Sequence, residues 1–579
     1  MTLQPYKEFR LKGGSAILDC IRRFSATEKL IFGILVLTAL WAALIMAGNA
    51  NGYFMTEVPA EGGALHEGEV GLPHTVNPVL AVTDVDRDIS SLVYAGLTKY
   101  KDGSIVPDLA SGWSVSADGL SYAFTLRPGI EWSDGTPLNA DDVVFTVERI
   151  QDPSLKSPRA AEWAGVTATA TSPTSVLFTL RQPYSPFLAN TGVGIIPRHI
   201  WSHVSDDQFI FSEYNIEPVG AGPYKVAGVD RDQGGIPTGY RLSAWNGYFG
   251  KKPYVTDIDF SFFPDQDHAL SALESGTIDS LPSVPPQEAA KLASNSGEPY
   301  AMISAPLSRI FGVFFNQNMN AALADPAVRQ ALDMSVDRSA LVGTVLYGYG
   351  KAVSGPLPPS LGSGETAVGQ TDVAGAQALL EKSGWKKGDD GIYAKKAAKG
   401  SAKVLPLSIS LYTADAPDLK QAAGELKDSW IKLGAGVDVK VFEPSELYQN
   451  IIRTRAYDAL LFGEAAGRDN DLFAFWHSSQ RNAPGLNVAM YANSKVDKIL
   501  EGIRSATGTD AMAASYAELD QMIGADFPAV FLYAPDFVYA VPKALKGVDL
   551  GVMTAPADRF GSVSDWYLGT ERVWKIFAK

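Results

Sequence analysis

The sequence predicts a mixed α/β protein preceded by one membrane-spanning helix. Apolar and polar residues alternate over residues 122–126, as in a half-buried strand, and apolar residues then recur at helical spacing over residues 139–150. A strand–helix–strand order follows over residues 405–441. Residues 30–48 form an uncharged apolar run of about 19 residues, and a helix of that length spans roughly 28 Å, enough to cross a bilayer.

The charges on either side of the apolar run predict its orientation. The basic residues before it are Lys7, Arg10, Lys12, Arg22, Arg23 and Lys29, and the acidic residues after it are Glu57, Glu61, Glu67 and Glu69. Because the basic side of such a helix stays in the cytoplasm, we expect a single-pass membrane protein whose main domain is periplasmic or at the cell surface. The expected segments are a cytoplasmic region over residues 1–29, a transmembrane signal anchor or signal peptide over residues 30–48, and a tether over residues 49–68.

An uncleaved anchor is favoured over a cleaved signal peptide. Gly48 and Ala50 are small residues at the positions that a signal peptidase reads, but the roughly 29 residues before the apolar run are long for a signal peptide. Cys20 is the only cysteine and precedes the run, so the exported part has no disulfide available to it.

Turn and cap residues bound the elements of the first half. Asn139 stands at a helix N-cap with Asp142 three residues later, which predicts a capping box. The apolar run 176–178 predicts a strand. Leu270 and Leu273 before Gly276 predict a short helix with a glycine stop.

The second half alternates strands and helices. Asp325 and Pro326 cap and begin a helix, and residues 372–384 repeat that style. Apolar residues alternate with others over residues 405–411, which predicts a strand. Apolar residues then recur at helical spacing over residues 419–433, which predicts a helix, and residues 437–441 predict another strand. This order implies a right-handed crossover with parallel pairing of the two strands.

The residue identities add a resemblance to a known family. Residues 96–152 closely resemble the segment shared by family 5 extracytoplasmic solute-binding proteins, the peptide-binding receptors of ABC importers. Residues 218–226 match the glycine–proline–tyrosine turn of that family, residues 252–260 its following strand, and residues 270–279 its short helix. The resemblance extends in pieces from about Asn77 to Tyr533.

The resemblance implies a type II periplasmic-binding-protein-like fold with two hinged lobes and an inserted β-rich subdomain. By this analogy lobe I takes residues 69–104, 206–312 and 531–579, and the inserted subdomain takes residues 105–205. Lobe II spans residues 313–530. The chain is expected to cross between the lobes near residues 311–316 and 531–535.

Composition and motifs argue against several other functions. A formal net charge of −15 is unsuited to nucleic acid, which needs clustered Lys and Arg. His199 and His203 are four apart, but the pattern offers neither a third ligand nor a His-Glu-x-x-His motif, so no metal is expected. No nucleophile elbow or spaced carboxylate pair stands out, so we expect no catalytic residues, no cofactor and no enzyme activity.

The function that the resemblance implies is capture of a peptide in an interlobe cleft and its delivery to the permease subunits of an ABC transporter, by a protein expected to be a monomer. Two alternatives stay open. One is a receptor for another small solute, such as a nickel chelate, haem, an oligosaccharide or glutathione. The other is an extracellular sensor that does not feed import.

Candidate ligand-binding residues also follow from the resemblance. In residues 462–473, Glu464 replaces the family's usual Trp, and Ala466 or Gly467 stands where the family has the acid that binds a peptide's amino group. Other acids nearby could substitute and Arg468 could meet a carboxylate, or the segment is a solvated loop with local Asp caps. For His477 the alternative role is packing, and for Gly220 and Gly222 it is a tight turn. The candidates are Thr83, Asp84, Gly220, Gly222, Asn316, Glu464, Arg468, Asp469, Asp471, Trp476 and His477.

Overall fold

The computed structural model describes residues 21–22, 24–101, 103–295, 297, 299–358, 361, 369–396, 404–468, 470–506 and 509–577. The chain divides into two compact units, residues 1–60 with 569–579, and residues 61–568. Cys20 and Asp469, which entered the sequence predictions, lie outside the described residues.

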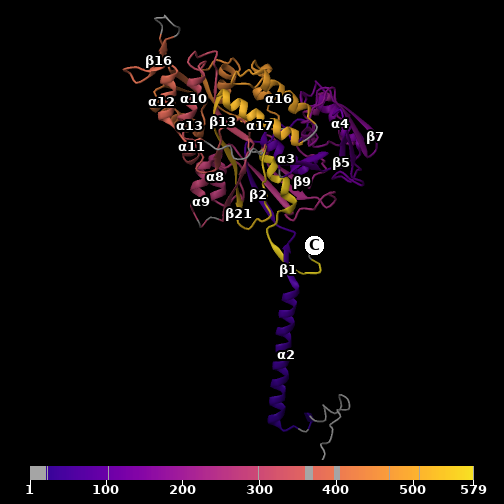
Figure 1. Cartoon of the computed structure of the whole chain (residues 1–579). Helices are drawn as coiled ribbons and strands as arrows, with labels where there is room; N and C mark the ends of the chain where they lie inside the picture. Colours follow the sequence, from indigo (N-terminus) through magenta and orange to yellow (C-terminus); the bar gives the residue numbers. More distant parts are fainter. Residues whose placement is uncertain are drawn as a thin grey trace, which may run out of the picture. The chain divides into compact units, whose positions relative to one another are not determined.

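The first unit contains the predicted membrane helix. Helix α2 (Ala26–Phe54) is continuous (Figure 1), and its part Ala26–Met46 is long and apolar enough to cross a membrane. It begins four residues before the apolar run because Ser25 and Glu28 cap it: the Ser25 amide donates to Glu28 Oε2 (2.8 Å) and the Glu28 amide to Ser25 Oγ (3.4 Å). Strand β1 (Met55–Pro59) follows and pairs antiparallel with β22 (Thr570–Trp574).

The expected tether over residues 49–68 is wrong at both of its ends. Residues 49–54 continue α2, and residues 64–68 lie in β2 (Ala64–Val70) of the second unit. Leu65 and Glu67 in that strand are fully buried. The glycines and glutamates of this segment suggested solvent exposure, but β2 pairs in parallel with a strand almost 200 residues later, β11 (Asp257–Phe263).

The second unit starts with a four-stranded sheet in the order β2-β11-β10-β9, with β9 at Tyr224–Arg231 and β10 at Pro237–Ala244. Helices α3 (Asp84–Val93) and η5 (Pro556–Asp565) pack against each other beside it. The β-rich segment that follows α3 in the chain contains the hairpin of β3 (Thr98–Lys101) and β4 (Ser104–Pro107). It also contains a second four-stranded sheet, β5-β6-β8-β7. Its strands are β5 (Ala110–Val115), β6 (Ser121–Leu126), β7 (Thr167–Ser172) and β8 (Ser175–Thr179).

A seven-stranded sheet forms the rest of the framework, in the order β12-β21-β13-β20-β18-β19 with β14 paired to β21. Its strands are β12 (Tyr300–Pro306), β13 (Arg309–Phe315), β14 (Gly350–Ala352), β18 (Ser408–Ala414), β19 (Gly436–Phe442), β20 (Ala459–Ala465) and β21 (Ala529–Pro542). A smaller three-stranded sheet contains β15 (Lys386–Lys387), β16 (Tyr393–Lys396) and β17 (Val404–Pro406).

Several sequence predictions are confirmed here. Helix α4 (Ala140–Gln151) has the predicted capping box of Asn139 and Asp142, and α10 (Pro326–Met334) has Asp325 as its N-cap. Strands β18 and β19 are parallel and joined by α13 (Pro417–Leu433). The single strand predicted over residues 405–411 is divided between β17 and β18, because Pro406 has no amide hydrogen to continue the ladder.

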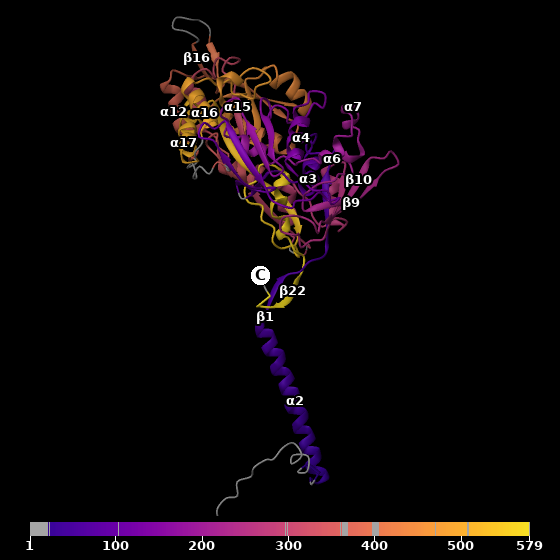
Figure 2. The ribbon, with the colours of Figure 1, turned by 90° about the vertical axis from the view of Figure 1, so that its right-hand side faces the viewer.

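The remaining longer helices are α8 (Gln266–Glu274), α9 (Pro286–Ala293), α11 (Arg338–Val345), α12 (Val373–Lys382), α16 (Ser494–Ser505) and α17 (Thr509–Asp526). The short helices are α5 (Phe187–Asn190), α6 (Arg198–Trp201), α7 (Asp206–Phe209), η1 (Glu213–Asn215), α14 (Pro444–Glu446), η3 (Leu447–Ile452), α15 (Phe473–Trp476) and η4 (Ser478–Gln480). Figure 2 shows the paired strands β9 and β10 side by side, and Figure 1 shows α12 and α4 on opposite sides of this unit.

Two large hydrophobic cores underlie this separation. Core one contains buried side chains between residues 65 and 260, together with Ala305 and residues between 537 and 566. Core two contains buried side chains between residues 310 and 533. A small third core lies around α8 and α9. Strand β21 belongs to core two in its first half and to the other cores in its second half, and it pairs with β13 through Phe311 and Tyr533.

Candidate ligand-binding cavity

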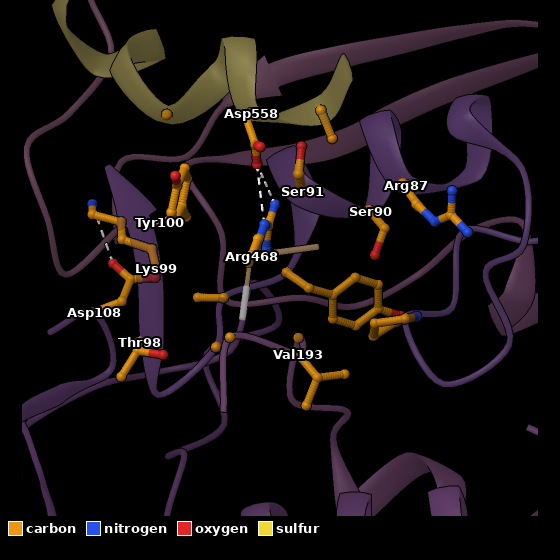
Figure 3. A pocket seen from close by; sticks show the side chains of 18 of the residues that line it. Arg87, Ser90, Ser91, Thr98, Lys99, Tyr100, Asp108, Val193, Arg468 and Asp558 are labelled. Carbon is orange, nitrogen blue, oxygen red and sulfur yellow. Dashed lines mark hydrogen bonds and ion pairs between the residues drawn. The ribbon is translucent and has the colours of Figure 1, made fainter. Parts of the chain in front are cut away.

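A cavity of about 390 Å³ lies beside α3 and η5. This volume is at the lower end of the usual range for small-molecule sites, about 300–1,000 Å³. Most lining residues come from the segments that build core one, whereas Gly467 and Arg468 come from the loop after β20. That loop is fixed at its ends by Ala466 and Leu472, which are buried in core two. The cavity is therefore lined by segments of core one and by the loop after β20, and Figure 3 shows Arg468 of that loop beside Asp558 of η5.

Helix α3 forms one wall because its two faces differ. Thr83 caps the helix and forms a capping box with Asp86, while Val85, Ile89 and Leu92 on its apolar face are buried in core one. The opposite face presents polar side chains to the cavity, namely Arg87, Ser90 and Ser91 (Figure 3).

Glycines allow the backbone segments of the next wall to meet. A Cβ atom on Gly96 would lie 2.7 Å from the carbonyl carbon of Gly192, so position 96 cannot accommodate a larger residue without a shift of the backbone. This close approach brings the Leu97 amide to the Thr191 carbonyl at 3.0 Å. It places β3, with Lys99 and Tyr100, along the cavity.

Ion pairs organise the charged lining (Figure 3). Arg468 Nε donates to Asp558 Oδ1 at 3.1 Å, and Lys99 Nζ lies 3.3 Å from Asp108. In addition, Arg159 lies 3.0 Å from Glu162. Although burial opposes its ionisation, Arg468 and the amides at residues 554 and 555 hold the pKa of Asp558 below its usual range. Burial raises the pKa of Asp108, against the effect of Lys99.

Three polar atoms of the lining are buried without a hydrogen-bond partner among the described residues. They are the hydroxyls of Tyr94 and Tyr100 and Nε of Arg159. A buried donor that makes no hydrogen bond costs about 1–3 kcal/mol, so each of these groups would be stabilised by an acceptor brought next to it. None of the three was singled out from the sequence, because nothing local distinguishes them from ordinary packing residues.

Of the candidates chosen from the sequence, Arg468 lines this cavity. Thr83 and Asp84 line a separate hollow, where Thr83 caps α3 and Asp84 pairs with Arg87 at 3.0 Å. Gly220 and Gly222 pack against the end of α3, where an added Cβ would lie 1.9 Å and 2.4 Å from the carbonyl oxygens of Val93 and Leu92. Their turn therefore approaches the protein's own backbone.

Apart from Asp469, which lies outside the described residues, the other candidates lie within the framework of core two. Asn316 is buried and donates to the carbonyl of Arg455 at 2.8 Å, and Trp476 is fully buried. His477 stacks on Phe473 with ring centres 4.0 Å apart. Asp471 accepts from Arg504 Nε at 2.9 Å. None of these four side chains is among the described residues that line the cavity.

Glu464 is a buried acid on β20, 8% exposed, and burial raises the pKa of its carboxyl well above the ordinary value. The folded state therefore holds a proton that the unfolded chain has released, so stability falls as pH rises toward the folded pKa. We expect Glu464→Gln to leave stability unchanged at pH 5 and to increase it at pH 8. Urea denaturation at both pH values checks this, and a variant that is less stable than the parent at pH 8 would contradict it.

Comparisons with known proteins agree with this architecture. A family model described as bacterial extracellular solute-binding proteins, family 5 Middle, matches residues 104–484. Protein XP55 of Streptomyces lividans is 30% identical over 481 residues, which cover 82% of this chain and 84% of that protein.

Two solved structures are similar over most of their length. The ABC transporter substrate-binding protein CtaP of Listeria monocytogenes has a TM-score of 0.74 at 26% identity, covering 88% of this chain and 99% of that one. The oligopeptide-binding protein AppA of Bacillus subtilis was solved with a nonapeptide and has a TM-score of 0.66 at 26% identity. The match covers 88% of this chain and 100% of that one. The predicted type II periplasmic-binding-protein-like fold is confirmed.

Proposed function

Because this chain belongs to family 5 of the bacterial extracellular solute-binding proteins, we propose that it captures short peptides in the cavity beside Arg468 and delivers them to the permease subunits of an ABC importer. Members of this family are binding receptors, so the chain is a binding protein and not an enzyme. The relatives support the proposal, since AppA was solved with a nonapeptide and CtaP is an ABC transporter substrate-binding protein.

The proposal rests on one observation, the lining of a single cavity by groups from both sides of the crossing. A ligand that touches both sides gains its full set of contacts only when the two sides are together. Binding therefore favours the closed arrangement, which a permease can recognise.

The domain boundaries are part of this proposal. Lobe I takes residues 69–104, 206–312 and 531–579, with the inserted subdomain at 105–205, and lobe II takes residues 313–530. Strands β13 and β21 contain the two proposed crossings and are hydrogen-bonded neighbours. Two adjacent strands that share one sheet make a short hinge, because both proposed crossings then lie at one place in the fold.

The binding domain is of the extracellular type. We further propose that α2 is retained as a signal anchor, with the N-terminus in the cytoplasm, and that the protein acts as a monomer. The apolar segment Ala26–Met46 of α2 supports the proposed anchor, because it is long enough to cross a membrane.

Full-length protein purified in mild detergent tests the function. Mass spectrometry of the small molecules that it retains should find short peptides. Small-angle scattering should then show compaction of the ligand-depleted protein when an unfractionated mixture of di- and tripeptides is added. Retention of only a sugar or a metal complex, or an unchanged scattering profile, would refute peptide capture.

A further inference from the structure

The charge of the cavity is opposite in sign to that of the whole chain. Among the described residues, its cationic lining residues are Arg87, Lys99, Arg159 and Arg468, and its acidic lining residues are Asp108, Glu162 and Asp558. Four cations and three acids give a formal charge of +1, whereas the whole chain carries −15. An acidic protein with a cationic cavity concentrates anions there relative to the surrounding surface.

Each acidic lining residue that the structure describes already has a cationic partner. Asp108 pairs with Lys99, Glu162 with Arg159, and Asp558 with Arg468. Arg87 differs, since its partner Asp84 lies in the neighbouring hollow and both side chains are about half exposed. An ammonium group entering this cavity would have to displace a guanidinium or a lysine from its carboxylate.

Hydrogen-bond donors in the cavity remain without acceptors. Nε of Arg159 is buried and makes no bond to a described residue, and a guanidinium can only donate. The hydroxyls of Tyr94 and Tyr100 are also buried and make no hydrogen bond to a described residue. These groups require an acceptor, and a carboxylate is the strongest one that a small organic ligand offers.

The arginines are also close enough to repel one another. Burial lowers the pKa of Arg159, Glu162 opposes this, and the neighbouring Arg468 and Arg87 lower it further. Arg468 uses Nε and Nη2 for Asp558, and its Nη1 lies on the side of Gly192, 3.8 Å from where a Cβ of that glycine would stand. A ligand carboxylate placed among these guanidiniums would relieve the repulsion and accept their free N–H groups.

We propose that the cavity selects a small acidic ligand whose amino end carries no positive charge, such as an N-acylated short peptide. Its carboxylate is bound by Arg159 and Arg468, and its carbonyl groups by the hydroxyls of Tyr94 and Tyr100. This inference rests on the proposed function and specifies its ligand. The cavity's modest volume restricts the ligand to a few residues.

One mixture of di- and tripeptides, prepared in four chemical forms, tests the inference with the full-length protein. The forms are untreated, N-acetylated, N-acetylated with amidated carboxyl ends, and N-acetylated with a phosphate monoester in place of the carboxyl end. Small-angle scattering gives the concentration of each form at half-maximal compaction. We expect the acetylated acids to act at a concentration at least tenfold lower than the untreated mixture, and the amidated form to have no effect.

The outcomes separate this inference from the proposed function. Untreated peptides that act as well as the acetylated acids, or amidated peptides that act equally, overturn the selectivity but leave peptide capture in place. Phosphate esters that act better than the carboxylates overturn the assignment of a carboxylate. No compaction by any form refutes peptide capture itself.

Substitutions locate the effect. Arg159→Gln should raise the half-maximal concentration of the acetylated acids at least tenfold and remove their advantage over untreated peptides. Arg231→Gln is the matched control, because Arg231 pairs with Glu213 and Glu217 outside the cavity, and it should change neither value. Tyr100→Phe removes one hydroxyl and keeps the ring, so it should weaken binding severalfold without changing the melting temperature. Equal responses of Arg159→Gln and Arg231→Gln, with Tyr100→Phe unchanged, would contradict the proposed contacts.

Discussion

Replacing Arg559 with methionine is expected to destabilise the protein by about 3–5 kcal/mol, the cost of removing one partner from a buried ion pair. Arg559 is fully buried on η5 and is surrounded by three carboxylates. Its Nη1 donates to Asp88 at 2.7 Å, its Nη2 to Glu67 at 3.0 Å, and it also pairs with Glu69. Methionine fills a similar volume but leaves these buried acids without a cation.

The loss should depend on pH in a defined direction. Burial raises the pKa of Glu67, Glu69 and Asp88 above the ordinary values, even with Arg559 present. Without Arg559 their pKa values rise further, so the folded variant binds protons that its unfolded chain has released above about pH 4. Stability of Arg559→Met should therefore fall more steeply than that of the parent as pH increases from 5 to 8.

Urea denaturation followed by tryptophan fluorescence measures both effects. Arg572→Met is the matched control, because Arg572 forms an exposed pair with Glu57 and its loss should cost no more than about 1 kcal/mol. Arg559→Lys keeps the positive charge but loses the several N–H donors of the guanidinium. Its loss of stability should therefore lie between those of Arg559→Met and Arg572→Met. A loss below 1 kcal/mol for Arg559→Met at pH 8 would show that the acids there are not held by this arginine.

The same cluster explains a limit of sequence-based prediction. Glu67 fell within the predicted tether over residues 49–68, because glutamate is rarely buried. Its burial depends on Arg559, almost 500 positions later in the chain. Local signals worked where the interaction is local, as in the capping box before α4 and the N-cap of α10. The parallel pairing of β18 and β19 could be predicted because the crossover helix lies between them in sequence.

The site was harder to predict for the same reason. Asp471 is an acid in a loop, but its partner is Arg504 on α16, so its charge is already used. The glycines of residues 220–222 permit a close approach, and only the fold reveals that the approaching group is the end of α3. Arg159 and Arg468 lie on different lobes of the proposed division. No spacing rule brings them to one cavity.

Arg468→Ala is expected to weaken ligand binding at least tenfold, since losing the attraction between this partly exposed guanidinium and a ligand carboxylate costs about 1.5 kcal/mol and each 1.4 kcal/mol is a factor of ten. The variant removes the charged group that the loop after β20 contributes to the cavity. It also leaves Asp558, whose side chain is 3% exposed, as an unpaired carboxylate facing an acidic ligand. Isothermal titration calorimetry with the untreated and acetylated peptide mixtures measures the change.

Asp558→Asn separates the two contributions of Arg468. The asparagine side chain no longer holds the guanidinium by charge, so Arg468 becomes free to bind a ligand carboxylate, and the cavity gains one unit of positive charge. Binding of the acetylated acids should therefore strengthen, whereas Arg468→Ala weakens it.

Arg481→Ala provides the matched control, because Arg481 donates to the carbonyl of Ser478 and does not line the cavity. If Arg468→Ala and Arg481→Ala bind equally well, the ligand does not occupy this cavity. If Asp558→Asn weakens binding instead, the carboxylate of Asp558 itself contacts the ligand, and the cavity accepts a cationic group.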